Sequence, residues 1–391
     1  MPEGKRAIYL DHAATTAVDP RVVAAMLPYF TEKYGNASSI YQLGRQSRQA
    51  LEEARRTVAD ILHADPEEII FTGCGSESDN AAIRGVAWAN RHQGNHIITT
   101  PIEHHAVGHT CEQLKREFGC EVTYVPVDQY GVVNPDDVGR AITERTVLIS
   151  IMYANNEVGT IEPLAEIGKI AKSKGIPFHS DAVQAGGVLD LNVERLGLDL
   201  MSLSAHKFYG PKGVGVLYAR RGTPLLPILT GGGQEWGKRA GTENVAYIVG
   251  LAAALRLAYE NAESNNRRIA ALRDRLIQGV LKSAPHAYLT GHPTQRLPNN
   301  ASFVLDYIEG EAILLQLDLQ GVAASSGSAC ATGATEPSHV LTAMGIPAAR
   351  AHGSLRLSLG NENTAEDVDF VVSILPGIVT RLQAMSPLGP R

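Results

Sequence analysis

The chain carries one cysteine in a setting that suits chemistry better than packing. Cys330 ends the stretch SSGSAC (325–330) and is surrounded by serine, glycine, alanine and threonine from 323 to 333. A structural cysteine usually sits among large apolar residues. Small residues instead predict a mobile, accessible segment that brings a nucleophilic thiol to its target.

A lysine in an unusual position is the second candidate. Lys207 lies in SAHKFYGPKGVG (204–215), in a predicted turn between two apolar strands. A lysine that is desolvated there has a lowered pKa and can form a Schiff base. Lys212 is the rival nucleophile, but its proline and glycine neighbours predict an exposed turn. A solvated surface residue is the ordinary alternative for any lysine.

Two further stretches predict groups that bind an anion and a cation. In FTGCGSESDN (71–80) a strand runs through glycines into a helix, whose first N–H groups suit a phosphate. A tight turn with a serine N-cap is the alternative, since the dinucleotide fingerprint is not met. Asp181, in PFHSDAVQAGG (177–187), ends a buried-looking strand. It is either an N-cap or the counter-ion of a cationic ligand atom.

Together these stretches meet the requirements of one cofactor. Pyridoxal phosphate needs a phosphate cradle, a carboxylate for its ring nitrogen and a lysine that forms a Schiff base. Gly75, Ser76, Asp181 and Lys207 supply these groups at the ends of predicted strands. The sequence therefore predicts a pyridoxal-phosphate enzyme.

The elements that must position these residues alternate through the first two thirds of the chain. Helical segments separate strand-like runs at 67–72, 96–100, 121–127, 146–153 and 176–180. This alternation predicts a mostly parallel α/β sheet between helices, with ligands at the carboxyl ends of the strands. After Thr242, one or two long helices at 245–281 and a short mixed region predict a second, smaller domain.

Composition and charge exclude several classes of protein. The 391 residues are 44% hydrophobic and 19% charged, as in an ordinary globular protein. A net charge of -6 without a basic cluster argues against a nucleic-acid partner. We expect no signal peptide, because the N-terminal stretch lacks an apolar region. We expect no membrane span, because the best candidate, 248–259, is too short. Four cysteines without a disulfide framework predict a cytoplasmic protein.

Stretches along nearly the whole chain resemble the signature stretches of the cysteine desulfurases, in the family's order. They are YLDHAATT (9–16), ESDN (77–80), IEHHAV (102–107), ANNEVGT (154–160), HSDAVQAGG (179–187), SAHKFYGPKGVG (204–215), RAGTEN (239–244), SSGSAC (325–330) and SLRLSLG (354–360). SSGSAC, with an extended loop before Pro337, resembles the branch that supplies sulfur for iron–sulfur clusters.

The resemblance implies an architecture and a reaction. The fold would be that of the aspartate aminotransferases (fold type I), with a large domain at 15–257 and a small domain formed by 1–14 and 258–391. Two chains would form a homodimer with active sites at the interface. The enzyme would use pyridoxal 5'-phosphate to convert L-cysteine to L-alanine, leaving the sulfur as a persulfide on Cys330 for an acceptor such as an iron–sulfur cluster scaffold.

The resemblance also implies a role for each site residue. Lys207 would hold the cofactor and shuttle a proton, His104 would stack on the pyridine ring, and Asp181 would pair with its nitrogen. Arg356 would bind the substrate carboxylate through its planar fork. The remaining roles belong to Asn155 and Gln184 near the phenolic oxygen and substrate, Gly75, Ser76, Ser204 and His206 at the phosphate, and Thr242 as a phosphate ligand from the partner subunit.

Some positions depart from the family's pattern. Ala37 and Tyr41 stand where proline and histidine are usual, and Trp236 stands where arginine is common. Gly75-Ser76 replaces the more frequent Ala-Thr but keeps a hydroxyl group and the backbone amides. We expect Tyr41 and Trp236 to affect the site entrance, the dimer contact or the choice of acceptor.

Other functions fit parts of the sequence. A selenocysteine lyase, or an enzyme that accepts both amino acids, needs the same residues. A cysteine hydrolase built on Cys330 leaves Lys207 without a purpose, and so does a non-catalytic interaction protein. His105 and His109 fall four apart on a predicted helix, but no HExxH motif is formed and no third ligand is evident, so no metal is predicted.

Overall fold

A seven-stranded sheet forms the centre of the computed structural model, which describes residues 7–326 and 337–386. In sheet order its strands are β2 (Ile69–Thr72), β8 (Gly215–Ala219), β7 (Leu200–Ser204), β6 (Phe178–Asp181), β5 (Thr146–Ser150), β3 (His96–Thr99) and β4 (Glu121–Tyr124). β8 is antiparallel to both of its neighbours, and the other pairs are parallel. The predicted mostly parallel α/β sheet is therefore confirmed.

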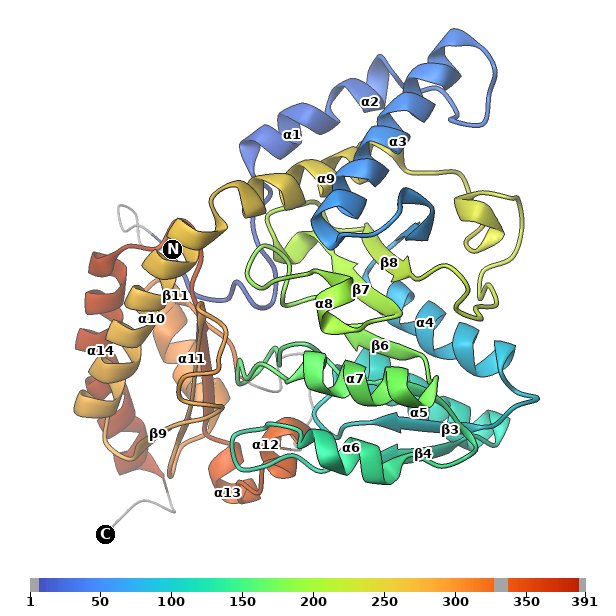
Figure 1. Cartoon of the computed structure of the whole chain (residues 1–391). Coiled ribbons are helices and arrows are strands. Elements are labelled where there is room, and N and C mark those ends of the chain that lie inside the picture. The colour runs from blue at the N-terminus through green and yellow to red at the C-terminus, as the bar shows by residue number, and fades with distance from the viewer. Residues whose placement is uncertain (1–6, 327–336, 387–391) are drawn as a thin grey trace.

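Helices cover both faces of this sheet (Figure 1). Leu217 of β8 packs with α4 (Gly75–Ala89) and α5 (His105–Phe118), whereas its neighbours Val216 and Tyr218 pack on the opposite face. This alternation follows from the strand itself, because successive side chains point to opposite sides. The helices on the second face include α1 (Pro20–Met26), α3 (Gln42–Leu62), α6 (Pro135–Ala141), α7 (Leu164–Lys174), α8 (Val193–Leu196) and α9 (Val245–Glu260).

Short elements complete this part of the chain. They are α2 (Pro28–Thr31), which follows α1, and the 3-10 turns η1 (Pro66–Glu68), η2 (Ala205–Lys207) and η3 (Glu235–Gly237). η2 continues directly from the end of β7, so the backbone turns sharply where the sheet ends. Lys207 is thereby placed at the carboxyl edge of the sheet, where the sequence predicted it.

A second core lies beside the first. A three-stranded antiparallel sheet in the order β12 (Ser354–Ser358), β10 (Asn300–Leu305), β9 (Ala287–Leu289) packs on α10 (Ala262–Ser283), α11 (Gly310–Leu319) and α14 (Ala365–Met385). The N-terminal strand β1 (Ile8–Tyr9) pairs in parallel with β11 (Val322–Ala323), so Ile8 and Leu10 belong to this core. α12 (His339–Ala343) and α13 (Ala348–Ala351) lie between the two cores. The domain limits inferred from the sequence stay a prediction.

Two helices extend what the sequence indicated. The long helical region after Thr242 divides at Asn261, where φ is -127°, into α9 and α10. α14 is long and apolar enough to cross a membrane by length and composition alone, which the search of the sequence missed. One face of α14 packs on α10 and α11, however, and a core helix passes the same test.

Candidate active site

A cavity of about 320 Å³ opens where β6 and β7 end, and most of the predicted site residues line it. These are Gly75, Ser76, His104, Asp181, Gln184, Ser204, His206, Lys207 and Arg356. Two larger cavities, of about 670 and 540 Å³, contain none of them. The carboxyl end of the parallel strands therefore gathers the chemistry, as this class of sheet requires.

One end of the cavity is built to receive an anion. α4 begins at Gly75, and a Cβ at this position would lie 2.8 Å from Cγ2 of Val183 and 3.3 Å from Cβ of Ser204. A larger residue would therefore crowd the wall, whereas glycine keeps it open. The first N–H groups of this 15-residue helix have no partner inside the helix and carry its positive dipole end. Helix start and serine hydroxyl together form a cradle for a phosphate.

His206 lies at the same end of the cavity and is uncharged at neutral pH. Its Nδ1 is 3.1 Å from Oγ1 of Thr15. Burial lowers the pKa of His206 to about 4, and the positive charges of Lys207 and Lys212 act in the same direction. The imidazole is therefore a neutral hydrogen-bonding group beside the cradle.

Lys207 is held at the cavity wall by the N-terminal segment. Its Nζ donates hydrogen bonds to the backbone carbonyls of Ala13, at 2.6 Å, and Ala14, at 2.8 Å. Gln184 donates from Nε2 to the same carbonyl of Ala13, at 3.0 Å. The amine thus has a fixed starting position inside the cavity, and it comes from a turn whose backbone is anchored to the sheet.

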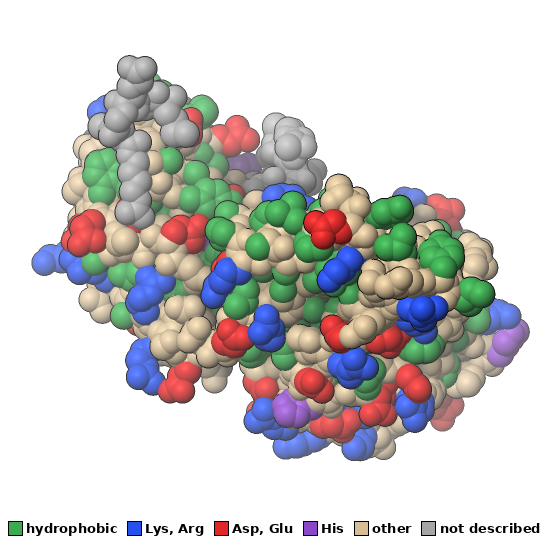
Figure 2. Space-filling model, turned by 90° about the horizontal axis from the view of Figure 1, so that it is seen from above, with side chains coloured by type: hydrophobic (Ala, Val, Ile, Leu, Met, Phe, Trp, Pro, Cys, Tyr) green, Lys and Arg blue, Asp and Glu red, His purple; other side chains and the backbone are tan. Residues whose placement is uncertain are grey.

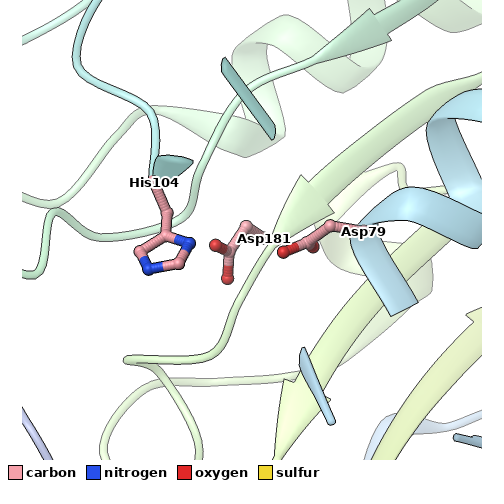
Figure 3. A group of neighbouring side chains, drawn as sticks. All are labelled: Asp79, His104 and Asp181. Carbon is pink, nitrogen blue, oxygen red and sulfur yellow. The ribbon is translucent and has the colours of Figure 1, made fainter. Parts of the chain in front are cut away.

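A carboxylate and an imidazole face each other deeper in the cavity (Figure 3). Asp181 is only 6% exposed, and one of its oxygens accepts a hydrogen bond from the N–H of Val183 at 2.9 Å. Burial raises the pKa of Asp181, while His104 and Lys207 act against that rise. His104 is the N-cap of α5: its Nδ1 accepts from the N–H of Ala106 at 3.1 Å, which places the proton of the neutral ring on Nε2.

Arg356 closes the side of the cavity formed by the second core. It lies on β12 and is 4% exposed. Nη2 is 2.9 Å from an oxygen of Asp11, and Nη1 donates to the carbonyl of Asn156 at 2.9 Å. Its Nε has no hydrogen-bond partner within the described part of the chain. The guanidinium is therefore oriented by two contacts, and its remaining N–H donors, among them that of Nε, are left for a ligand such as a carboxylate.

Comparison with known proteins identifies relatives along nearly the whole chain. The family model for class-V aminotransferases matches residues 8–371. A cysteine desulfurase IscS of Methanosarcina thermophila is 56% identical over 386 residues, which are 99% of this chain and 95% of that protein. A cysteine desulfurase IscS of Clostridium botulinum is 52% identical over 383 residues, 97% of this chain and 96% of that protein.

The chain belongs to the cysteine desulfurase family. Among solved structures, a NifS-like protein matches with a TM-score of 0.90 at 40% identity, covering 96% of this chain and all of the other. A structure described as SspA in complex with cysteine matches with a TM-score of 0.81 at 34% identity, covering 90% and 98%. The fold is therefore that of the type I pyridoxal-phosphate enzymes, and the expectation drawn from the sequence is confirmed.

Cysteine desulfurases depend on pyridoxal phosphate, and the cavity fits this cofactor. The open wall at Gly75 suits the phosphate, the buried Asp181 suits a cationic ring nitrogen, and Lys207 suits a covalent link. Asp79, His104 and Asp181 each place a ligand atom within 4.8 Å of the others, a spacing that could also hold a metal ion. Because the lysine and the cradle share this cavity, we attribute this grouping to the cofactor site and not to a metal site.

Three predicted residues do not line the cavity. Asn155 is buried: its Nδ2 donates to the carbonyl of Ile102 at 2.9 Å, and its Oδ1 accepts from the N–H groups of Glu157 and Val158. Its neighbour Asn156 lines the cavity instead. Thr242 is exposed and lies away from this cavity. Its role in the partner's site stays a prediction. Cys330 and most of the predicted loop lie outside the described residues.

The structure adds lining residues that the sequence reasoning missed. They are Ala13, Ala14, Cys74, Asp79, Met152, Asn156 and Val183. Asp79 had a recognisable signal, because it shares the buried face of α4 with Ala82 and Ile83. An acid on the apolar side of a helix needs a partner or a function.

Proposed function

We propose that this protein takes sulfur from L-cysteine and transfers it through Cys330 to an acceptor protein. The observation that carries the proposal is the cavity, in which Lys207, Asp181 and Arg356 lie together in a member of the cysteine desulfurase family. SspA, which is described in complex with cysteine, supports the choice of substrate. An iron–sulfur cluster scaffold is the acceptor that we propose, because the stretch SSGSAC resembles that branch of the family.

The described residues divide the work of binding and proton transfer. When bound, pyridoxal phosphate supplies an electron sink that weakens bonds in the attached amino acid. Arg356 binds and orients the substrate carboxylate. Nζ of Lys207 acts as the proton shuttle of the reaction: it accepts a proton and later returns it. Asp181 keeps a negative charge at the ring nitrogen. His104, as a neutral ring, covers the cofactor without adding charge.

The sulfur transfer itself requires a thiolate. The sulfur of Cys330 attacks the substrate sulfur, so an S–S bond forms while the substrate C–S bond breaks and leaves its electron pair on the carbon side. Protonation of that carbon gives L-alanine, and Cys330 retains a persulfide. A thiol acceptor then takes the outer sulfur and restores Cys330.

The test compares the parent with Cys330→Ala and with Cys120→Ser. Cys120 is a half-buried cysteine just after the end of α5 and serves as the control. All three proteins should absorb visible light with pyridoxal phosphate, and L-cysteine should perturb each spectrum. Only the parent and Cys120→Ser should release alanine. A Cys330→Ala protein that turns over at the parent's rate would remove Cys330 from the mechanism. A parent that binds no cofactor would defeat the whole proposal. Comparing alanine release from L-cysteine with that from L-selenocysteine distinguishes a cysteine desulfurase from a selenocysteine lyase.

The proposal includes a homodimer, which the exposed apolar residues support. Large hydrophobic side chains are exposed on α1, on α2 and in the loops at 34–41 and 226–236. They include Leu27, Phe30, Tyr34, Ile40, Tyr41, Leu226, Leu229 and Trp236. Figure 2 looks onto the end of the molecule that carries α1 and α2, and it shows hydrophobic side chains between the charged ones. Exposed apolar surface of this kind is typical of an interface between chains.

Two departures from the family's pattern, Tyr41 and Trp236, lie in this exposed set, which favours an effect on the dimer contact. Ile40, at 89% exposure, offers the test. Sedimentation should give a dimer for the parent and a monomer for Ile40→Asp, with weaker cofactor retention if Thr242 serves the partner's site. A monomeric parent with full activity would contradict this part of the proposal.

The cytoplasm is the compartment that we propose, since the described cysteines are unpaired.

A further inference from the structure

A line of buried polar groups lies behind Asp181 and ends at Asp79. Oγ of Ser150 is 2.9 Å from Nδ1 of His179, and Nε2 of His179 is 3.0 Å from Oγ of Ser202. Ser202 also forms a hydrogen bond with Asp79, which is 1% exposed. Three adjacent strands and α4 each contribute one member, so packing of the whole sheet fixes the position of Asp79.

The surroundings of Asp79 favour its uncharged form. The described groups that face it are Asp181, Glu103, His104 and His179. His179 is neutral, because burial lowers its pKa to about 3, so its 3.7 Å approach to Asp79 is not an ion pair. Burial and the negative charge of Asp181 raise the pKa of Asp79 well above its ordinary value.

Asp79 lines the cofactor cavity, and one of its oxygens is unsatisfied within the described part of the chain. Oδ1 is buried and has no hydrogen-bond partner among the residues described. Figure 3 shows the carboxyl group of Asp79 beside that of Asp181, on the side opposite His104. An uncharged carboxyl group has an O–H to donate. A carboxylate oxygen of Asp181 lies within 4.8 Å of an oxygen of Asp79 and is an acceptor close to it.

The position of Asp79 along α4 links the two ends of the cofactor cavity. Asp79 follows Gly75 by four residues, so both occupy one face of the same helix. The first turn of α4 forms the phosphate cradle, and the next turn carries Asp79. A single rigid element therefore sets the spacing between the cradle and the support of Asp181.

We propose that Asp79 is a positioning residue of the cofactor site: its uncharged carboxyl group donates a hydrogen bond to Asp181 and holds that carboxylate in the orientation that pairs with the ring nitrogen of pyridoxal phosphate. The inference rests on the proposed function only in taking pyridoxal phosphate as the occupant of the cavity. Asp79 acts through Asp181 and needs no contact with the substrate.

The test uses Asp79→Asn, which keeps the shape and a donor, and Asp79→Leu, which keeps neither. Two measurements apply: the dissociation constant of pyridoxal phosphate from the apoprotein, and the pH midpoint of the visible band of the loaded protein. Asp79→Asn should match the parent within about threefold in affinity, whereas Asp79→Leu should bind about tenfold more weakly or worse, the value of a hydrogen bond to a charged group.

The pH midpoint separates positioning from a purely structural role. In Asp79→Leu the pH midpoint should rise by about half a pH unit or more. Without Asp79 the positive charge on the ring nitrogen is stabilised less, so the ring withdraws less electron density from the nitrogen of Lys207 and that nitrogen keeps its proton to a higher pH. In Asp79→Asn it should not move. Glu162→Gln, a buried acid outside the cavity, is the control and should change neither reading.

Several results would overturn the inference. A shift of about one unit in Asp79→Asn would mean that Asp79 is charged in the native protein. Parent-like affinity and midpoint in Asp79→Leu would mean that Asp79 does not act on Asp181, and Asp79→Ala gives the same reading if the leucine variant does not fold. Both results leave the proposed function intact. A parent that fails to bind pyridoxal phosphate would instead refute the proposed function and this inference together.

Discussion

Replacement of Arg356 by glutamine should abolish selective binding of the substrate carboxylate. The guanidinium is buried and already oriented by Asp11 and by the carbonyl of Asn156. A carboxylate that binds there needs no rearrangement of the side chain, so the full strength of the new hydrogen bonds goes into binding. Asp11 keeps 20% side-chain exposure and can be solvated when the arginine is removed, so we expect the variant to fold.

The expected magnitude follows from the number of bonds lost. Two charge-assisted hydrogen bonds at about 1.5 kcal/mol each give about 3 kcal/mol, or roughly 150-fold in kcat/KM. The loss should appear mainly as a higher KM, because the carboxylate does not change charge during the reaction and is bound equally in ground and transition states.

The assay measures alanine release from L-cysteine and loss of sulfide from cysteamine, which has no carboxylate. The parent should prefer cysteine, and Arg356→Gln should lose that preference. Arg350→Gln is the matched control. Arg350 also pairs with an aspartate, Asp306, at N–O distances of 2.7 and 3.1 Å, but it does not line this cavity. If Arg356→Gln binds the cofactor and still prefers cysteine as strongly as the parent does, another group binds the carboxylate and the assignment is wrong.

Three further predictions concern stability, each measured as the free energy of unfolding in urea. In the parent, the two Nη atoms of the buried Arg55 lie 2.8 and 2.9 Å from the carboxylate oxygens of Glu235. Glu235→Gln leaves this arginine without its carboxylate and should lower the free energy of unfolding by about 3–5 kcal/mol. A loss below about 1 kcal/mol would contradict this prediction. Burial raises the pKa of Glu162 to about 8, so the folded protein holds a proton that the unfolded chain has released. Between the ordinary glutamate pKa of 4.5 and a pKa of about 8, Glu162 should therefore lower the free energy of unfolding by about 1.4 kcal/mol for each pH unit that the pH rises. Glu162→Gln should remove this contribution and make the measured slope less steep. Gly187→Ala should cost about 1–3 kcal/mol, because φ is +73° and a Cβ would lie 2.6 Å from that of Ala258; an unchanged value would show that the backbone relaxes there.

Local patterns in the sequence were enough to place Gly75, Asp181 and Lys207 at the edge of the sheet where the cavity lies. Gly75 begins α4, Asp181 is the last residue of β6, and Lys207 ends the turn after β7. These positions follow from strand length, glycine placement and the alternation of strands with helices, all of which act over a few residues. The roles assigned to Arg356 and His104 depended instead on the resemblance to the cysteine desulfurases.

Neighbouring residues of one type could not be told apart in this way. Asn155 and Asn156 differ by one position, yet the loop uses the first for its own hydrogen bonds and turns the second toward the cavity. Asp79 is one of two acids in α4, and only its place on the apolar face of that helix distinguished it from Glu77 before its burial was known. Which side of a loop or helix faces a ligand depends on what packs against it, and that information is spread over the chain.

The sequence by itself determined the class of sheet, the edge at which ligands bind and the type of chemistry, because hydrophobic periodicity and turn residues act locally. Only the tertiary structure decided which distant groups share the cavity. Nζ of Lys207 bonds to carbonyls at Ala13 and Ala14, nearly two hundred residues earlier, and Arg356 meets Asp11 across a still longer separation. Contacts of that range form only when both cores are packed, so no short stretch of sequence encodes them.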